Sequence, residues 1–166
     1  IWAAGDCVEV KHLVSGQKVH MPLALNANRT GRIAGDQVGS AVVGRSSAQR
    51  FRGTAGSLIT QVLDYSLAQT GLSLGEAKRA GFDAVSFERE SRSRARYYPG
   101  SKPLKTRIVV ERRTRRLLGA QMVGEEGVVG RIDALATALF ARMTVDEVHH
   151  LDLAYAPPFG PVYDAI

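Results

Sequence analysis

The segment "TRIVVERRTRRLLGAQMVGEEGVVGRIDALATALFARM", residues 106–143, decides the fold of this 166-residue chain. It begins with two runs of apolar and β-branched residues, Thr106–Arg112 and Leu117–Gly124, which are typical of strands. The arginine-rich stretch between them is compatible with an exposed turn. From Val128 to Met143 apolar residues recur at intervals of three and four, and this period predicts an amphipathic helix.

Neighbouring segments extend this pattern in both directions. Residues 82–90 alternate apolar and polar side chains and predict a third strand. Ser73 and Glu76 form a capping-box pattern for a short helix that Gly81 ends, and Thr144 and Glu147 form a second one for a helix ending near residue 150. The proline-rich tail from residue 156 is expected to be extended. The sequence predicts an α+β unit, an antiparallel sheet with helices on one face.

The N-terminal third has a different character. Residues 1–7, "IWAAGDC", read as a strand that ends at Gly5-Asp6, residues 8–18 as a polar loop, and residues 20–38 as a helix with Pro22 at its first position. This strand and helix are typical of an α/β domain. The glycine-, serine- and arginine-rich stretch 38–53 marks a boundary, so we expect two regions, 1–50 and 51–166. The apolar start is typical of half a buried strand, and we expect the chain to be part of a larger protein.

Composition restricts the function. The hydrophobic fraction of 45% and the charged fraction of 23% are ordinary for a globular protein, and no apolar run is long enough to span a membrane. The lone Cys7 cannot form an internal disulfide, and no cysteine or histidine has zinc spacing, so no metal site is expected. A reducing, cytoplasmic location follows. The net charge of +6 favours anionic partners.

Basic residues are concentrated in one part of the chain. Eleven of the 22 lie between Arg89 and Arg116. Three interpretations stay open: a solvated face of the sheet, a surface for nucleic acid, and the rim of a site for a phosphorylated small molecule. No recognition-helix, RRM or zinc-finger signature is present, which disfavours nucleic acid. The adjacent His149 and His150 point about 100° apart on a helix and are expected to take no part in catalysis.

The Gly5-Asp6 pair has a more specific meaning. An aspartate at the carboxyl end of a strand in an open α/β sheet is well placed to accept hydrogen bonds from the hydroxyls of a nucleotide cofactor. The free N–H groups at the start of the following helix would face the same crevice.

Six segments together are similar to one family: "AAGDC", "PLALNANRTGRIAGD", "FRGTAGSLITQVLDYSLAQTGLS", "RARYYPGSKPL", "RRLLGAQMVGEEGVVGRID" and "LDLAYAPPFGPVYD". They resemble the C-terminal part of the coenzyme A-disulfide reductase and NADH oxidase branch of the FAD-dependent pyridine nucleotide-disulfide oxidoreductases. The resemblance implies that residues 1–50 end the FAD-binding domain and that residues 51–166 form a dimerisation domain. It also implies a homodimer that binds neither nucleic acid nor membranes.

The resemblance implies a set of site residues. Gly5 and Asp6 would hold the ribityl chain of FAD, and Leu23 and Ala24 would present N–H groups to the flavin. Asn28 and Tyr163 would lie at the substrate. The dinucleotide fingerprint and the redox cysteine of the family lie outside this sequence, so NADH or NADPH would bind elsewhere and the chain alone is expected to be inactive.

The same resemblance implies a role for two tyrosines that each lie two residues before a proline, Tyr97 and Tyr155. Each would come from the dimerisation domain of one subunit and approach the flavin and redox cysteine of the other, with Tyr98 as the alternative to Tyr97. A neutral phenol can donate a hydrogen bond at pH 7 without acting as a base. Both would be catalytic, and Tyr155 would also contact FAD.

The electron acceptor stays open between coenzyme A disulfide, a persulfide or polysulfide, and oxygen. Some coenzyme A-disulfide reductases have a lysine near the position of Tyr163, and its absence weakens the coenzyme A assignment. Two other classes of function also stay open: a basic nucleic-acid-binding module, and a structural association domain whose tyrosines only pack.

Overall fold

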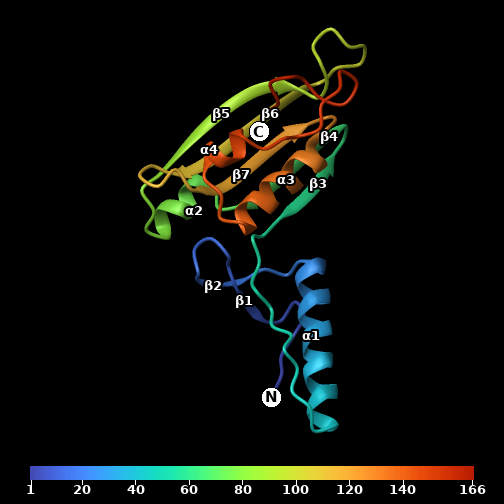
Figure 1. The fold of residues 1–166 in the computed structure, drawn as a ribbon, viewed down its shortest axis with the longest axis vertical. Helices are drawn as coiled ribbons and strands as arrows, with labels where there is room; N and C mark the ends of the chain where they lie inside the picture. The colour runs from blue at the N-terminus through green and yellow to red at the C-terminus, as the bar shows by residue number, and fades with distance from the viewer. The chain divides into compact units, whose positions relative to one another are not determined.

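The computed structural model describes all 166 residues. They form two compact units, residues 1–56 and residues 57–166 (Figure 1). The sequence had placed a boundary between residues 50 and 51. No helix has the length and apolar character needed to cross a membrane.

The first unit contains a small hairpin and one long helix. Strands β1 (Glu9–Lys11) and β2 (Lys18–His20) pair in antiparallel fashion, with Val10 opposite Val19. The prediction of a loop over residues 8–18 is therefore wrong, because the buried Val10 anchors a short ladder there. The strand predicted at residues 1–7 is also not formed, since no segment of this chain pairs with it.

Helix α1 (Ala24–Val42) begins later and ends later than predicted. Pro22 is not its first residue, because Leu23 is the N-cap and has extended backbone angles, φ −117° and ψ 134°. The helix continues into the first residues of the stretch expected to mark the domain boundary and ends before Gly44, whose φ of +68° suits a residue without Cβ.

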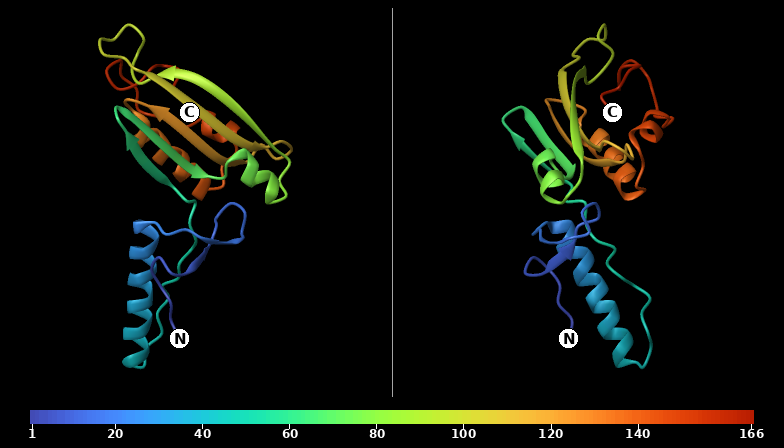
Figure 2. Two further views of the ribbon diagram at one scale, coloured as in Figure 1. Left: turned by 180° about the vertical axis from the view of Figure 1, so that it is seen from behind. Right: turned by 90° about the vertical axis from the view of Figure 1, so that its left-hand side faces the viewer.

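The second unit is built on a five-stranded antiparallel sheet in the order β3-β4-β7-β6-β5 (Figure 2). Its strands are β3 (Leu58–Val62), β4 (Tyr65–Gly71), β5 (Ala84–Arg92), β6 (Pro103–Glu111) and β7 (Leu117–Gly124). The three predicted strands are confirmed as β5, β6 and β7, and β7 has the predicted bounds. Strands β3 and β4 were not predicted.

Three helices complete this unit: α2 (Leu74–Arg79), α3 (Val128–Phe140) and α4 (Val145–His149). Helices α3 and α4 lie on the same face of the sheet (Figures 1 and 2). Both predicted capping boxes are present at α2 and α4. The fold class, an antiparallel sheet with helices on one face, is confirmed.

Helix α3 ends three residues before the predicted Met143. Arg142 has a φ of +59°, its N–H donates to the Leu139 carbonyl, and the Met143 N–H donates to the Ala138 carbonyl. These two bonds form a Schellman motif, which satisfies the last carbonyls and stops the helix.

The core lies between α3 and strands β4 and β7. Leu118 and Leu135 are fully buried there, and Leu139 is nearly so. Gly71 and Gly119 face each other across the β4–β7 ladder, where their missing side chains allow the backbones to approach closely.

Candidate functional site

Two segments far apart in the sequence lie side by side in the second unit. One is the connection between β5 and β6, residues 93–102, which we call the tyrosine loop. The other is the C-terminal tail, residues 151–166. The N–H of Ala95 donates to the carbonyl of Pro157 over 3.1 Å, and both views of the ribbon bring the two segments together (Figures 1 and 2).

This contact brings Tyr97 and Tyr155 close enough to interact. Desolvation raises the pKa of Tyr155 above its ordinary value of 10, and the interaction with the neighbouring Tyr97 hydroxyl raises it further. The Tyr155 side chain is half exposed and that of Tyr97 mostly exposed. Both side chains are therefore accessible, and a phenol hydroxyl can donate a hydrogen bond to a bound group.

The tail and the tyrosine loop share an anchor on α3. Arg131 is only 8% exposed, and its Nε and Nη2 donate to the two carboxylate oxygens of Asp164 over 2.5 and 2.6 Å. The Nη2 atom also donates to the carbonyl of Ser93 at the base of the tyrosine loop, over 3.3 Å. The remaining Nη1 donates to the Gly127 carbonyl over 2.8 Å. We call Arg131, Asp164 and Ser93 the Arg131 brace.

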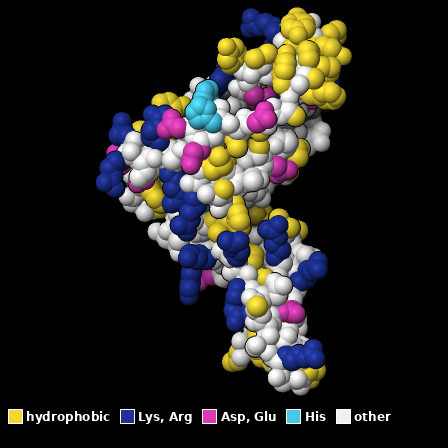
Figure 3. Space-filling model, in the orientation of Figure 1, with side chains coloured by type: hydrophobic (Ala, Val, Ile, Leu, Met, Phe, Trp, Pro, Cys, Tyr) yellow, Lys and Arg dark blue, Asp and Glu magenta, His cyan; other side chains and the backbone are white.

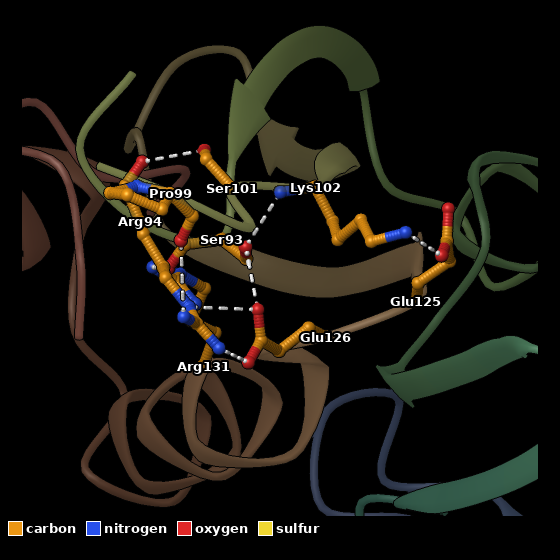
Figure 4. Close-up of polar contacts among 8 residues, drawn as sticks. All are labelled: Ser93, Arg94, Pro99, Ser101, Lys102, Glu125, Glu126 and Arg131. Atoms are coloured by element: carbon orange, nitrogen blue, oxygen red, sulfur yellow. Dashed lines mark hydrogen bonds and ion pairs between the residues drawn. The ribbon is translucent and has the colours of Figure 1, made fainter. Parts of the chain in front are cut away.

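A second set of contacts holds the base of the tyrosine loop (Figure 4). The Glu126 carboxylate accepts hydrogen bonds from the Ser93 hydroxyl and from the Arg94 guanidinium. The bonds from Arg94, together with that from Ser93, lower the pKa of Glu126 despite some desolvation. Lys102, at the other end of the loop, pairs with Glu125 over 2.7 Å. The turn between β7 and α3 therefore fixes both ends of the loop.

Sequence reasoning missed Arg131, Asp164 and Glu126. The sequence does contain a sign that Arg131 is unusual. Arg131 lies next to Ile132 and three residues after Val128, so it is a charged residue on an otherwise apolar face of the helix. Such a residue needs a partner when it is buried. The sequence does not indicate that the partner is Asp164.

The surface around the tyrosines is apolar. Figure 3 shows hydrophobic side chains gathered over the tips of the tyrosine loop and the tail. The large exposed side chains of these segments are Tyr97, Leu151, Leu153, Tyr155, Phe159, Val162 and Tyr163. A cavity of about 550 Å³ lies between the tail and α3, and Tyr155, Tyr163 and Arg131 line it. Tyr98 is half-buried, and its N–H donates to the Ala95 carbonyl.

Just over half of the basic residues in the arginine-rich run form ion pairs. Six of its eleven basic residues form ion pairs with carboxylates: Arg94, Lys102, Lys105, Arg107, Arg112 and Arg115. Glu88 accepts two of them, Arg107 and Lys105, and their hydrogen bonds lower its pKa. A surface neutralised in this way suits a solvated sheet face better than a surface for phosphates.

The other predicted residues belong to the first unit. Gly5 has a φ of +92°, and its N–H donates to the Thr30 hydroxyl of α1 over 3.1 Å. Asp6 follows with an exposed carboxylate that has no hydrogen-bond partner, while its carbonyl bonds to the His20 ring over 2.8 Å. The Gly5–Asp6 turn is thus attached to α1 with its carboxylate free.

The start of α1 is also open. Leu23 provides no side-chain cap, and the first turn contains no acidic residue. Ala24 and Asn28 are exposed. The first amide to bond within the helix is that of Ala27, to the Leu23 carbonyl, which leaves the N–H groups of Ala24 and its two successors directed outward.

The second unit combines a five-stranded antiparallel sheet, helices on one face of it, and a C-terminal tail that is held by the Arg131 brace and carries Tyr155. This combination defines a class of domain. Residues 57–165 match the pyridine nucleotide-disulphide oxidoreductase dimerisation domain. The chain belongs to this family of oxidoreductases, and the resemblance seen in the sequence is confirmed.

Particular relatives narrow the comparison. The chain is 39% identical over all its 166 residues to the CoA-dependent NAD(P)H sulfur oxidoreductase of Pyrococcus abyssi, and 34% identical to the coenzyme A disulfide reductase of Staphylococcus epidermidis. It spans 36% of the length of each. A solved NAD-dependent persulfide reductase from A. fulgidus superposes with a TM-score of 0.92 at 39% identity, covering 99% of this chain and 29% of the other.

Proposed function

We propose that this chain is the C-terminal part of a cytoplasmic flavoprotein that passes electrons from NADH or NADPH through FAD to a small disulfide, a persulfide or polysulfide, or oxygen. Residues 1–50 would end the FAD-binding domain, and residues 51–166 would dimerise and complete the active site of the partner subunit. The observation that carries this proposal is the contact of the tyrosine loop with the tail, through the bond from the Ala95 N–H to the Pro157 carbonyl, which brings Tyr97 and Tyr155 to one accessible, apolar surface.

The residues of the first unit fit FAD. The free carboxylate of Asp6 can accept hydrogen bonds from ribityl hydroxyls, and Gly5 and Thr30 hold it in place. The uncapped start of α1, at Leu23 and Ala24, carries partial positive charge and N–H donors that favour an anionic pyrimidine edge. When bound, FAD would supply the electron transfer.

The tyrosine hydroxyls would act on the acceptor. A phenol hydroxyl is a hydrogen-bond donor, so these two can donate to a thiolate that leaves a disulfide or to a reduced oxygen species. Arg96, beside Tyr97, and Arg89, whose Nη2 donates to the Tyr163 carbonyl, form no ion pair and can attract an anionic substrate. Asn28 and Tyr163 are our candidates for contacting that substrate.

The β3–β4 hairpin is our candidate for the homodimer interface. Ile59 and Tyr65 expose about half of their side chains, and Leu63 at the turn exposes 87%. Leu63 also has a φ of +52°, a conformation that costs a bulky residue roughly 1–2 kcal/mol. A strained leucine without packing in its own chain is explained if a partner subunit buries it.

The experiment is the removal of each hydroxyl in the full-length enzyme. Tyr155→Phe should lower kcat by ~10² to 10³, as expected for a donor that faces developing charge. Tyr97→Phe should cost less, and the double variant should be non-additive because both hydroxyls serve one group. Stopped-flow reoxidation of the flavin locates the affected step. Tyr65→Phe makes the same change at a tyrosine with the same 50% exposure outside the two segments; because Tyr65 lies in the candidate dimer interface, its kinetics are compared only after sedimentation has shown that the variant is still a dimer.

The two other classes of function predict results that differ from those expected for the flavoprotein. A structural association domain predicts wild-type reoxidation for Tyr97→Phe and Tyr155→Phe with coenzyme A disulfide, polysulfide and oxygen, and that result would refute the proposed role. A nucleic-acid-binding module predicts salt-dependent DNA binding. The ion pairing of the arginine-rich run disfavours this module.

A further inference from the structure

Both tyrosine segments are held by a single buried side chain. The guanidinium of Arg131 binds the Asp164 carboxylate, in the tail that carries Tyr155, and the Ser93 carbonyl, in the loop that carries Tyr97. Its Nη2 atom contacts both groups, so the two segments meet at one planar group.

We propose that Arg131 is a positioning residue for the tyrosine pair: it fixes Tyr155 relative to Tyr97 by binding both of their segments at once. This inference rests on the proposed function, in which the two hydroxyls act on one substrate group. Arg131 itself acts through Asp164 and Ser93.

The tail depends on this anchor. It contains no helix or strand, and apart from the contact between Tyr155 and Tyr97 themselves, two other hydrogen bonds connect residues 155–166 to the rest of the unit. These are the bond from Ala95 to the Pro157 carbonyl and a long bond of 3.4 Å from Arg89 to the Tyr163 carbonyl. Without Arg131, the tail would keep the packing of Ala165 and these two single hydrogen bonds, and it would lose its only ion pair.

The choice of an ion pair also points to positioning rather than to stability. Arg131 interrupts the apolar stripe of α3, where a leucine-sized side chain would pack without desolvating a charge. Burying an ion pair contributes little net stability compared with apolar packing. What arginine adds is a rigid planar fork that binds a carboxylate with two parallel bonds and still reaches a carbonyl.

The test uses the full-length flavoenzyme and compares two variants of the brace, Arg131→Lys and Asp164→Asn. Lysine keeps the charge but loses the fork, and asparagine keeps the shape but loses the charge. The matched control is the exposed pair Arg115–Asp146, which is also bidentate, with distances of 2.6 and 2.7 Å, and lies in the same unit. Arg115→Lys and Asp146→Asn repeat the same changes away from the tyrosines.

The first readout is the coupling between the two hydroxyls, which is the non-additivity of Tyr97→Phe and Tyr155→Phe in their effects on kcat. Tyr97→Phe, Tyr155→Phe and the double variant are made in the wild-type background and in each brace variant. We expect Arg131→Lys to lower kcat on the order of 10- to 100-fold with a smaller change in KM, because misplacing a reacting group by about 1 Å has costs of this size. The two tyrosine substitutions should then become additive within about twofold.

The second readout does not depend on activity. The N–H of Ala95 bonds across the two segments, so its hydrogen exchange reports whether they stay together. In both brace variants we expect this exchange to accelerate by about tenfold or more, with flavin content unchanged, while both control variants keep the wild-type rate.

Each outcome decides the inference. It is overturned if the brace variants keep both the tyrosine coupling and the Ala95 protection, or if kcat falls while the coupling is preserved. If Arg131→Lys does not fold, Asp164→Asn decides. If the tyrosine substitutions have no effect in the wild-type background, the proposed function fails, and exchange at Ala95 still decides whether the brace fixes the two segments.

Discussion

Gly119→Ala is expected to be among the most damaging small substitutions in the second unit. A Cβ at this position would lie 2.0 Å from the carbonyl oxygen of Leu72, 2.5 Å from its nitrogen and 2.8 Å from its carbonyl carbon. Ordinary Cβ contacts begin at 3.4 Å. All three obstacles are backbone atoms, so no side-chain rotation can relieve the clash.

The size of the effect follows from what must move. Separating Leu72 from β7 breaks the hydrogen bond from its N–H to the Leu118 carbonyl, which is 2.9 Å long and buried. A buried group left without its partner costs about 1–3 kcal/mol, and overpacking a core by one methyl adds about 1–3 kcal/mol. We therefore expect a loss of about 2–6 kcal/mol, a large part of the 5–15 kcal/mol typical of a domain.

Urea unfolding of the 166-residue chain, followed by far-UV circular dichroism, measures this loss. Trp2 is the only tryptophan and lies in the first unit, so its fluorescence should give an unchanged transition. Gly130→Ala is the matched control: it makes the same chemical change in α3, where a Cβ would meet no atom within 4 Å. Replacing this helical glycine should stabilise the unit by roughly 0.5–1 kcal/mol.

The prediction is that Gly119→Ala lowers the free energy of unfolding and that Gly130→Ala raises it. If Gly119→Ala unfolds within 0.5 kcal/mol of wild type, the close approach of Leu72 to β7 does not limit the packing, and the reasoning is wrong.

Three further predictions concern the interface, acid stability and alkaline activity. Leu63→Asn should raise the unfolding free energy of the chain by about 1 kcal/mol, because asparagine tolerates positive φ better than leucine does. The same substitution should weaken the dimer of the full-length enzyme, which sedimentation measures. An unchanged dimer would contradict the proposed interface. The pKa of Glu126 is lowered in the fold, so its contribution is present above its ordinary value of 4.5 and is lost as pH falls through the lowered value. Glu126→Gln should therefore lower the free energy of unfolding at pH 7 by less than about 1 kcal/mol, because the carboxylate is partly exposed. At pH 3 the difference in unfolding free energy between wild type and variant should be smaller, and an equal difference at both pH values would contradict this. The pKa of Tyr155 is raised, so its hydroxyl stays a donor until pH exceeds 10. The rate of flavin reoxidation should therefore fall only above that pH in wild type, and this fall should be absent in Tyr155→Phe. If both proteins show the same alkaline fall in rate, another group is responsible for it.

The sequence was sufficient for the parts of the fold whose stability is local. Leu117–Gly124 forms a strand with the predicted bounds, and the capping boxes at Ser73 and Thr144 are present, because residue type and near neighbours determine these features. Strand β3 could not be read in the same way. All five of its side chains are exposed in this chain, so it lacks the alternation that marks a half-buried strand.

The site shows the same limit more clearly. The resemblance named Tyr97 and Tyr155, but their proximity depends on contacts such as that of Arg131 with Asp164, which are 33 residues apart. The β1–β2 hairpin escaped notice because strands of three residues give too little periodicity to recognise. Ion pairing of the arginine-rich run likewise depends on which carboxylates the sheet brings alongside it.

The anchoring of the tyrosine loop at its base has a consequence for how such enzymes can be altered. Ser93 and Arg94 on one side and Ser101 and Lys102 on the other make most of the bonds that hold it, whereas residues 96–100 between them are mostly exposed. The tip is therefore a cassette: its sequence can be exchanged for that of another family member while the framework below stays folded. If Tyr97 contacts the substrate as proposed, a change of a few residues in this tip would alter substrate preference without a change in the rest of the domain.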